Sequence, residues 1–220
     1  MLRPPISPPS VTPVVYVVDD DDGVRTSLRW LIESVGYEVL AFRNGQEFLD
    51  GYDPDQPGCL LLDVRMPAMG GFELLEKIQG RGSAFPVLFL TGHGTIPMSV
   101  KAMKQGAFDF IEKPFNDQDL IDRIQVAANQ SMDAYRRKKE IDKTSNSLAS
   151  LSPREREVVD HLIAGKPSKV IAYELGISKK TVEVHRANIR EKLKVASVAQ
   201  LVKLVLDSGA SQGVEKGERY

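Results

Sequence analysis

The sequence predicts an α/β domain with a doubly wound, five-stranded parallel sheet, followed by a small all-α domain. Up to residue 129, short apolar runs alternate with amphipathic stretches, which is the pattern of parallel strands joined by helices. After Leu151 only helical periodicity remains, interrupted by short turns that contain glycine. We therefore expect a first domain at 14–129, a helical linker at 130–147 and a second domain at 148–207.

The strands of the first domain are predicted by their composition. Val14–Val18 is a continuous β-rich run, as expected of a strand buried on both faces. Similar runs predict strands at 38–42, 59–62, 87–90 and 108–111. Apolar residues at three- and four-residue spacing predict helices at 24–35, 46–50, 71–79, 96–105 and from Asp117 onward. In such a sheet, ligands bind beyond the carboxyl ends of the strands.

The helix that begins at Asp117 has no evident stop signal. Good helix formers continue through Lys139, and the serines and asparagine of 145–147 then interrupt the pattern. We expect one long or bent helix from Asp117 to about Lys143, with a flexible linker as the alternative.

The second domain is predicted to hold four helices. Ser152-Pro153-Arg154-Glu155 supplies an N-cap, a proline at the first helical position and an acidic residue three positions after the cap. This first helix should stop at Gly165, and further helices are expected at 168–175, 178–193 and 197–206. The tight turn at 175–178 is typical of a helix-turn-helix.

Charge is distributed unevenly along the 220 residues, although the net charge is only −1. The range 14–129 has 18 acidic and 10 basic residues, whereas 148–207 has 7 acidic and 11 basic residues. The pattern suggests that only the second half meets a polyanion.

Several protein classes are disfavoured. No apolar run approaches the roughly 18 residues that a bilayer requires, so we expect no membrane partner. Met1–Pro13 contains five prolines and reads as a disordered lead-in, not a signal peptide, and 208–220 reads as a frayed tail. The single cysteine, Cys59, cannot form an internal disulfide and is expected to be buried. We expect a cytoplasmic protein.

Five polar residues stand at the predicted strand ends. Asp19 and Asp20 follow the first strand, Asp63 the third, Thr91 the fourth and Lys113 the fifth. Three carboxylates in one crevice need a cation, and oxygen ligands favour Mg²⁺ or Mn²⁺. Such an ion beside a carboxylate suits phosphoryl transfer, with the lysine and the hydroxyl binding the other oxygens. Any one of these aspartates alone would more often be a turn residue or a helix cap.

The segments around these residues resemble the response-regulator receiver domains over roughly Val14–Ala128. The matching segments are Val17-Val18-Asp19-Asp20-Asp21, Leu62-Asp63-Val64-Arg65-Met66-Pro67, Leu90-Thr91-Gly92-His93-Gly94 and Glu112-Lys113-Pro114-Phe115.

The receiver resemblance implies a role for each site residue. Asp63 would be the phosphoacceptor, and Thr91 and Lys113 would bind the phosphoryl oxygens. Mg²⁺ would be held by Asp20, Asp63 and the backbone carbonyl of Arg65, with Asp19 acting mainly through water.

The resemblance also implies a switch. Thr91 and the aromatic residue Phe110 would turn inward, and the surface of 96–105 and 108–111 would then favour dimerisation. The Lys113–Pro114 peptide would be cis. His93 lies between two glycines and is expected in an exposed loop without a chemical role.

The third helix of the second domain is the candidate nucleic-acid contact. One arc, with Val182, His185, Ile189 and Leu193, should face the core. The opposite arc and its flanks would lie in the major groove of double-stranded DNA, the early residues reading bases and the basic ones meeting phosphates. The candidates are Lys179, Lys180, Thr181, Glu183, Val184, Arg186, Ala187, Asn188, Arg190 and Lys194. From the pattern alone, a solvated helix of a protein-binding bundle is the alternative.

This domain resembles the LuxR/NarL-type effector domain, and the whole chain resembles the FixJ-like branch of two-component response regulators. The matching segments are Leu151–Val158, Ile171–Ser178 and Thr181–Arg186. Two recognition positions that are often basic in NarL-like members are Glu183 and Ala187 here. The DNA sequence that NarL-like members bind therefore cannot be assumed for this protein.

The resemblance implies a regulator, not an enzyme. A sensor histidine kinase would phosphorylate Asp63, and the protein would form a homodimer and bind DNA half-sites about one helical turn apart. By family analogy it would activate transcription. We expect the acidic receiver to mask the basic domain until it is phosphorylated; activation of a freely tethered effector domain by dimerisation alone is the alternative. A phosphohydrolase of haloacid-dehalogenase type would need an aspartate where Arg65 stands. A protein-interaction switch that never binds DNA stays open, and an autoinducer-binding regulator would lack its ligand domain.

Overall fold

The computed structural model describes residues 11–81, 85–92 and 94–207. The chain divides into two compact units, Met1–Arg136 and Arg137–Tyr220, and each is described by itself. Most of the predicted lead-in, His93 and the predicted tail at 208–220 lie outside the described residues. Within the described residues, no helix is both long enough and apolar enough to span a membrane.

The first unit is a five-stranded, all-parallel sheet in the order β2-β1-β3-β4-β5, which confirms the predicted doubly wound fold. The strands are β1 (Val14–Val18), β2 (Glu38–Phe42), β3 (Gly58–Asp63), β4 (Val87–Thr91) and β5 (Asp109–Glu112). The helices are α1 (Asp22–Ser34), α2 (Gly45–Gly51), α3 (Gly71–Gly80), α4 (Ile96–Lys104) and α5 (Asp117–Ala149).

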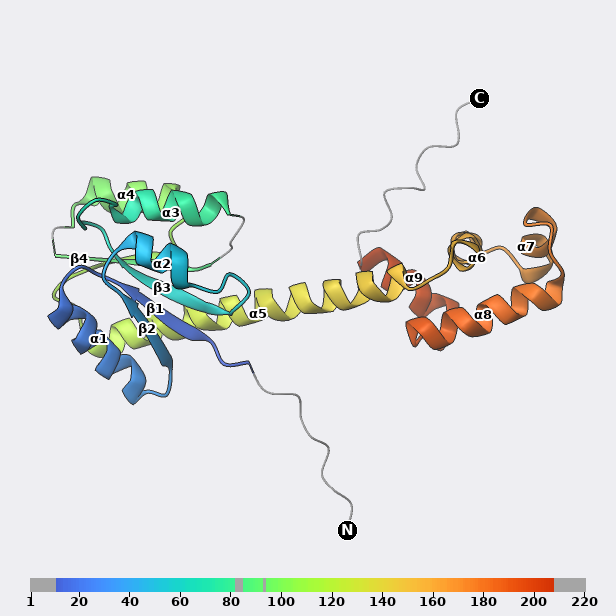
Figure 1. Cartoon of the computed structure of the whole chain (residues 1–220), viewed down its shortest axis with the longest axis horizontal. Helices are drawn as coiled ribbons and strands as arrows, with labels where there is room; N and C mark the ends of the chain where they lie inside the picture. Colours follow the sequence, from blue (N-terminus) through green and yellow to red (C-terminus); the bar gives the residue numbers. More distant parts are fainter. Residues whose placement is uncertain (1–10, 82–84, 93, 208–220) are drawn as a thin grey trace, which may run out of the picture. The chain divides into compact units, whose positions relative to one another are not determined.

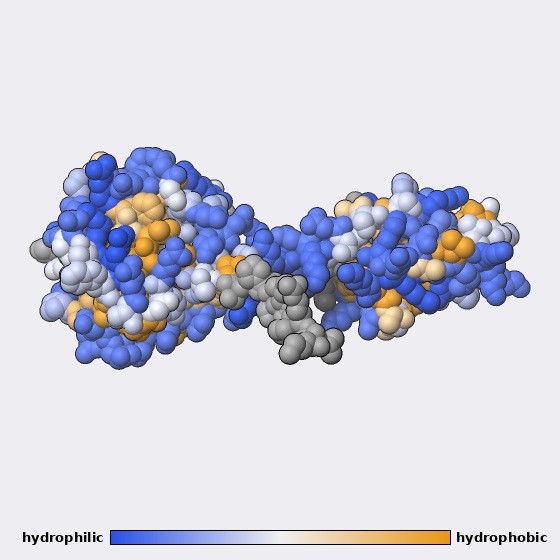
Figure 2. Space-filling model, turned by 60° about the horizontal axis from the view of Figure 1, so that its bottom comes forward, coloured by the Kyte–Doolittle hydropathy of each residue, from blue (hydrophilic) through white to orange (hydrophobic). Residues whose placement is uncertain are grey.

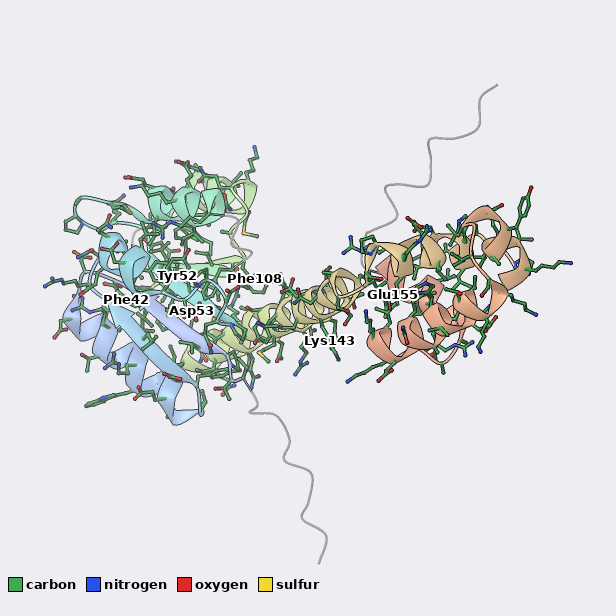
Figure 3. The ribbon with its side chains drawn as sticks, turned by 45° about the vertical axis from the view of Figure 1, so that its right-hand side comes forward. Phe42, Tyr52, Asp53, Phe108, Lys143 and Glu155 are labelled. Atoms are coloured by element: carbon green, nitrogen blue, oxygen red, sulfur yellow. The ribbon has the colours of Figure 1, made fainter. Side chains whose placement is uncertain are left out.

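Helices cover both faces of the sheet, with α2, α3 and α4 on one face and α1 and α5 on the other (Figure 1). Side chains alternate between the faces, so Tyr16 packs beneath α2 and α3 while Val15 and Val17 pack against α1 and α5. Phe42 and Tyr52, labelled in Figure 3, belong to the first of these cores.

The start of β3 is fixed against strand β1 and helix α5. A Cβ atom on Gly58 would lie 1.9 Å from the carbonyl oxygen of Val14, so only glycine allows this approach. The Gly58 N–H donates to the buried hydroxyl of Ser131 on α5 at 2.9 Å. These contacts define the register of β3, and therefore the position of Asp63 at its other end.

Helix α5 is longer than predicted. We expected the polar residues at 145–147 to end it, but the helix continues to Ala149, so that expectation was wrong. The Thr144 and Ser147 hydroxyls donate to the carbonyls of Glu140 and Lys143, at 2.8 and 2.9 Å. Their hydrogen bonding is thus satisfied within the helix and does not compete with it.

The second unit packs four helices around one core: α6 (Pro153–Ile163), α7 (Ser168–Glu174), α8 (Lys179–Leu193) and α9 (Val198–Asp207). The predicted capping box at Ser152 and Glu155 is formed. Gly176 has φ of 65°, a conformation that favours glycine, and it makes the tight turn between α7 and α8. Figure 2 shows that the visible face of each unit is mainly hydrophilic, with hydrophobic residues in separate patches.

Candidate functional site

The carboxyl edge of the sheet gathers the predicted strand-end residues. Asp19 directly follows β1, and Asp63 and Thr91 end β3 and β4. Asp19 and Thr91 are almost completely buried, with 3% and 1% of their surfaces exposed. The Lys113 N–H donates to the Thr91 carbonyl at 2.8 Å, which fixes the chain just after β5.

Lys113 joins two of the three aspartates. Its Nζ donates to Asp19 Oδ2 at 2.7 Å and to Asp63 Oδ1 at 3.2 Å. The second oxygen of Asp63 accepts the backbone N–H of Arg65 at 2.7 Å. The Lys113–Pro114 peptide is cis, as the receiver resemblance implied. The Asp63 carboxylate is therefore oriented by contacts to both of its oxygens.

The ionisation of this cluster follows from its burial. Burial raises the pKa of Asp63, and the Arg65 N–H and the Lys113 ammonium only partly oppose this effect. Burial lowers the pKa of Lys113, but its hydrogen bond to Asp19 and the two nearby carboxylates outweigh burial, and the net pKa is raised. Lys113 therefore stays protonated at neutral pH and binds anionic oxygen.

Asp19 is held by contacts that the sequence did not reveal. Its Oδ1 accepts the Asp21 N–H at 2.9 Å, and its carbonyl accepts Arg25 NH1 at 2.6 Å. Arg25 also pairs with Asp22 at 2.7 Å. No sequence motif marks Arg25, because its contact depends on how the first turns of α1 fold over the end of β1. Asp20 is exposed, and its carboxylate accepts no hydrogen bond from the described part of the chain.

The donor set fits a hard divalent cation. The carboxylates of Asp19 and Asp63 share one ammonium, which leaves a net charge of −1, and the exposed Asp20 follows Asp19 in the chain, so all the donors are oxygens. Among the described residues, no three histidine, cysteine, aspartate or glutamate side chains converge as a ready-made metal site. A cation here would take few protein ligands and keep several waters, as Mg²⁺ does.

The predicted switch residue Phe110 is half-buried in the core that lies under α3 and α4. Its ring centroid lies 6.3 Å from that of Phe89, which in turn lies 4.9 Å from that of Phe72. A line of aromatic rings thus connects β5 to α3 through β4.

Helix α8 has the two faces that its periodicity predicted. Val182, Ile189 and Leu193 are buried, and His185 is partly buried. The opposite face is exposed to solvent and carries Lys180, Val184, Ala187, Asn188 and Glu191.

Two of the candidate residues on the flanks of α8 make hydrogen bonds within the domain. Thr181 belongs to the helix cap, where its N–H donates to the Ser178 hydroxyl at 3.0 Å. Arg186 is partly buried, and its NH1 donates to the Ser168 hydroxyl on α7 at 2.7 Å. The remaining flank residues, Lys179, Glu183, Arg190 and Lys194, are exposed.

A second lysine–carboxylate pair lies within this unit. Lys192 Nζ donates to Glu155 Oε2 at 2.6 Å and to the Ser150 carbonyl at 3.3 Å. Glu155, labelled in Figure 3, is in the first turn of α6 and also accepts the Ser152 N–H at 2.8 Å. The pair ties α6 to α8; the sequence had suggested only the helix cap.

Comparison with known proteins gives matches for both units. The family model of the response regulator receiver domain matches residues 15–125, and that of the bacterial regulatory proteins of the luxR family matches residues 149–205. The chain is 44% identical to the transcriptional regulatory protein FixJ of Azorhizobium caulinodans, over 90% of this chain and 93% of that protein.

Two solved structures extend the comparison over nearly the full length. The response regulator StyR gives a TM-score of 0.84 at 45% identity, over 89% of this chain and 98% of that one. Full-length FixJ from B. japonicum gives a TM-score of 0.54 at 43% identity, over 91% of this chain and 99% of that one. The described geometry and these matches agree, and the chain belongs to the FixJ-like branch of the two-component response regulators, a family of transcriptional regulators with a receiver and a LuxR-type helix-turn-helix domain.

Proposed function

We propose that a sensor histidine kinase phosphorylates Asp63 and that this promotes dimerisation, sequence-specific DNA binding and activation of transcription. One observation carries the proposal: the Asp63 carboxylate is oriented by the Arg65 N–H and by Lys113 Nζ, which also binds Asp19. The receiver would comprise 14–129, the linker 130–147 and the effector domain 148–207, in a protein of the cytoplasm.

The chemistry is a phosphoryl transfer to Asp63. A carboxylate oxygen of Asp63 forms the new P–O bond, and the P–N bond of the phosphohistidine breaks, with the electron pair leaving on the imidazole, which takes up a proton. Lys113 would then bind one phosphoryl oxygen and the Thr91 hydroxyl another, as charge-assisted hydrogen bonds. The ion pairs of Lys113 with Asp19 and Asp63 support this role.

The local charge of the site supports a bound cation. Asp19, Asp20, Asp63 and the Arg65 carbonyl would hold Mg²⁺, or Mn²⁺, which offsets negative charge on the phosphoryl oxygens. The chain's own residues orient the acceptor: Arg65 fixes one oxygen of Asp63, and Arg25 fixes the backbone at Asp19.

The output is proposed to run through the surface of α4 and β5. Phosphorylation would draw Thr91 and Phe110 inward, and the exposed apolar residues Ile96, Val100 and Met103 of α4 support a dimer contact there. A homodimer would present two α8 helices to half-sites about one helical turn apart.

Phosphoryl transfer from a radiolabelled small phosphodonor to the full-length protein tests the first step. We expect stable label on the wild type with Mg²⁺ and none on Asp63→Asn. Asp50→Asn is the matched control, because Asp50 is exposed on α2, and it should be labelled like the wild type. Equal labelling of Asp63→Asn would refute the assignment of the phosphoacceptor.

A further inference from the structure

The N-terminal end of α7 contacts one flank of the candidate DNA-reading helix through a single hydroxyl. Ser168, the first residue of α7, is 8% exposed and is one of few buried polar residues in this unit. A buried hydroxyl requires hydrogen-bond partners, and it can accept and donate at once. Ser168 Oγ accepts Arg186 NH1 at 2.7 Å, which leaves its own hydrogen available to an acceptor.

Glu183 lies on the same flank of α8 and is a suitable acceptor. It lies one turn before Arg186 on α8, with its Oε2 at 4.0 Å from Arg186 Nε. The Ser168 hydroxyl is the main cause of a lowered pKa of Glu183, and the charge of Arg186 contributes to it. Glu183 is therefore ionised at neutral pH, and a carboxylate in this state only accepts hydrogen bonds.

The exposures of the two charged side chains differ. The Arg186 side chain is 20% exposed, whereas that of Glu183 is 53% exposed. The arginine is thus held against α7, and the carboxylate extends from the same half of α8 that carries Lys180 and Val184. This geometry favours Arg186 as an internal counter-charge over a direct phosphate contact.

The positive charge of Arg186 offsets the repulsion between the Glu183 carboxylate and the DNA phosphates. A bare carboxylate brought into the major groove is repelled by the phosphates on both sides. An arginine fixed beside it makes the pair locally neutral, so the glutamate can approach a base edge at lower cost. Among the major-groove donors, cytosine N4 is the one that glutamate typically reads.

We propose that Ser168 is a positioning residue that, through Arg186, fixes Glu183 as the acceptor for cytosine N4 at one position of each DNA half-site. The inference rests on the proposed function, because it takes α8 to be the DNA-reading helix. It adds a residue outside α8 to the determinants of operator sequence, and it assigns one base of an otherwise unknown operator.

The test measures base preference and not affinity alone. Full-length protein with Mg²⁺ and beryllofluoride first selects its site from random duplex DNA, and each base of the half-site is then varied in turn. Glu183→Gln should shift the preference at one position from cytosine to adenine, since glutamine pairs with adenine N6 and N7. Ser168→Ala should reduce the preference for cytosine at that same position by about tenfold.

Two variants separate positioning from a general structural role. Ser168→Thr keeps the hydroxyl and should keep the wild-type preference. Ser150→Ala is the control, because Ser150 is exposed and its hydroxyl donates only to the Ser147 carbonyl at 2.6 Å. It should leave every base ratio unchanged.

Three outcomes would overturn the inference: a wild type without preference at this position, a Glu183→Gln profile equal to the wild type, or a Ser168→Ala variant that weakens binding to all sequences by one factor. Because Glu183 is exposed, its variant should fold even if Ser168→Ala does not. Selection that is identical with and without beryllofluoride would instead contradict the proposed phosphorylation control, and the base ratios would still decide the role of Ser168.

Discussion

Lys113 in the receiver and Lys192 in the effector domain each bind a buried carboxylate, at 2.7 Å to Asp19 and 2.6 Å to Glu155. The surroundings of the two pairs differ. Lys113 is shared with a second carboxylate, Asp63, whose pKa is raised by burial. Glu155 has Lys192 to itself, also accepts the Ser152 N–H, and its pKa is lowered chiefly by the Lys192 hydrogen bond.

The comparison separates a site for chemistry from a structural contact. In the receiver, negative charge exceeds positive charge, and the proposed function assigns this excess to a bound cation, which would in turn offset the charge of a phosphoryl group. In the effector domain, the charges balance within the pair, and the pair holds two helices together. The same two functional groups therefore join two helices in the effector domain, whereas in the receiver we propose that they prepare a reaction.

The largest expected effect is the loss of Lys113 from the receiver pair. Lys113→Met should weaken the beryllofluoride-dependent increase in DNA binding by about 100-fold or more, because the bound phosphoryl mimic and two carboxylates lose the lysine's positive charge. The exposed Lys77, paired with Glu73 on α3 at 2.9 Å, gives the control Lys77→Met, which should respond like the wild type. Titration of a labelled operator measures the response of both variants. A normal response of Lys113→Met would refute the proposal that the Lys113 pair serves phosphorylation.

Loss of charge from the balanced pair should destabilise the effector domain. Glu155→Gln should lower its free energy of unfolding by about 1–3 kcal/mol, a range that allows for partial solvent screening of Lys192. Hydrogen exchange of the α6 and α8 amides in the full-length protein reports on this domain alone. Glu157→Gln, at an exposed position, should change the free energy by less than about 0.5 kcal/mol.

The stability lost in Glu155→Gln should depend on pH. A carboxyl group whose pKa is lowered by folding favours the folded state above its unfolded pKa, which is about 4.3 for glutamate. That contribution disappears as the pH falls through the lower, folded pKa. The difference between the wild type and Glu155→Gln should thus be constant near pH 7 and shrink toward pH 3. A constant difference over this range would mean that packing, not charge, holds the pair.

The smallest expected effect has the opposite sign. Folding raises the pKa of Asp63, so at neutral pH its ionised form opposes folding, and this opposition vanishes as the group becomes protonated at low pH. Asp63→Asn should therefore stabilise the receiver, by about 1 kcal/mol. Hydrogen exchange of the β1 and β3 amides in the full-length protein, at increasing urea, measures the stability of the receiver. If Asp63→Asn destabilised the receiver, the claim that the ionised Asp63 carboxylate opposes folding would be wrong.

The sequence was sufficient to predict the sheet and the edge at which the site forms. Buried parallel strands appear as continuous apolar runs, and β1 was predicted with its observed bounds. Because the carboxyl ends of parallel strands meet at one edge, residues as distant as Asp19 and Lys113 could be assigned to one site. The exposed face of α8 followed from periodicity alone, since all its residues lie on one helix.

The contacts between elements could not be predicted in this way. The sharing of Lys113 between Asp19 and Asp63, the Arg25 bond to the Asp19 carbonyl and the Ser168 bond to Arg186 depend on packing distances of a few tenths of an ångström. Periodicity does not contain such distances. The end of α5 was misjudged for a related reason, since the same hydroxyls that can interrupt a helix can also bond within it.

Enrichment of genomic DNA fragments by the purified full-length protein, with and without Mg²⁺ and beryllofluoride, tests the central claim most directly. We predict that specific fragments are enriched only when both additives are present, because the acyl-phosphate mimic at Asp63 completes the charge of the site and releases DNA binding. The genes beside those fragments would identify the controlled pathway. Equal enrichment in both conditions would contradict phosphorylation control, although it would leave the effector domain as a DNA-binding module.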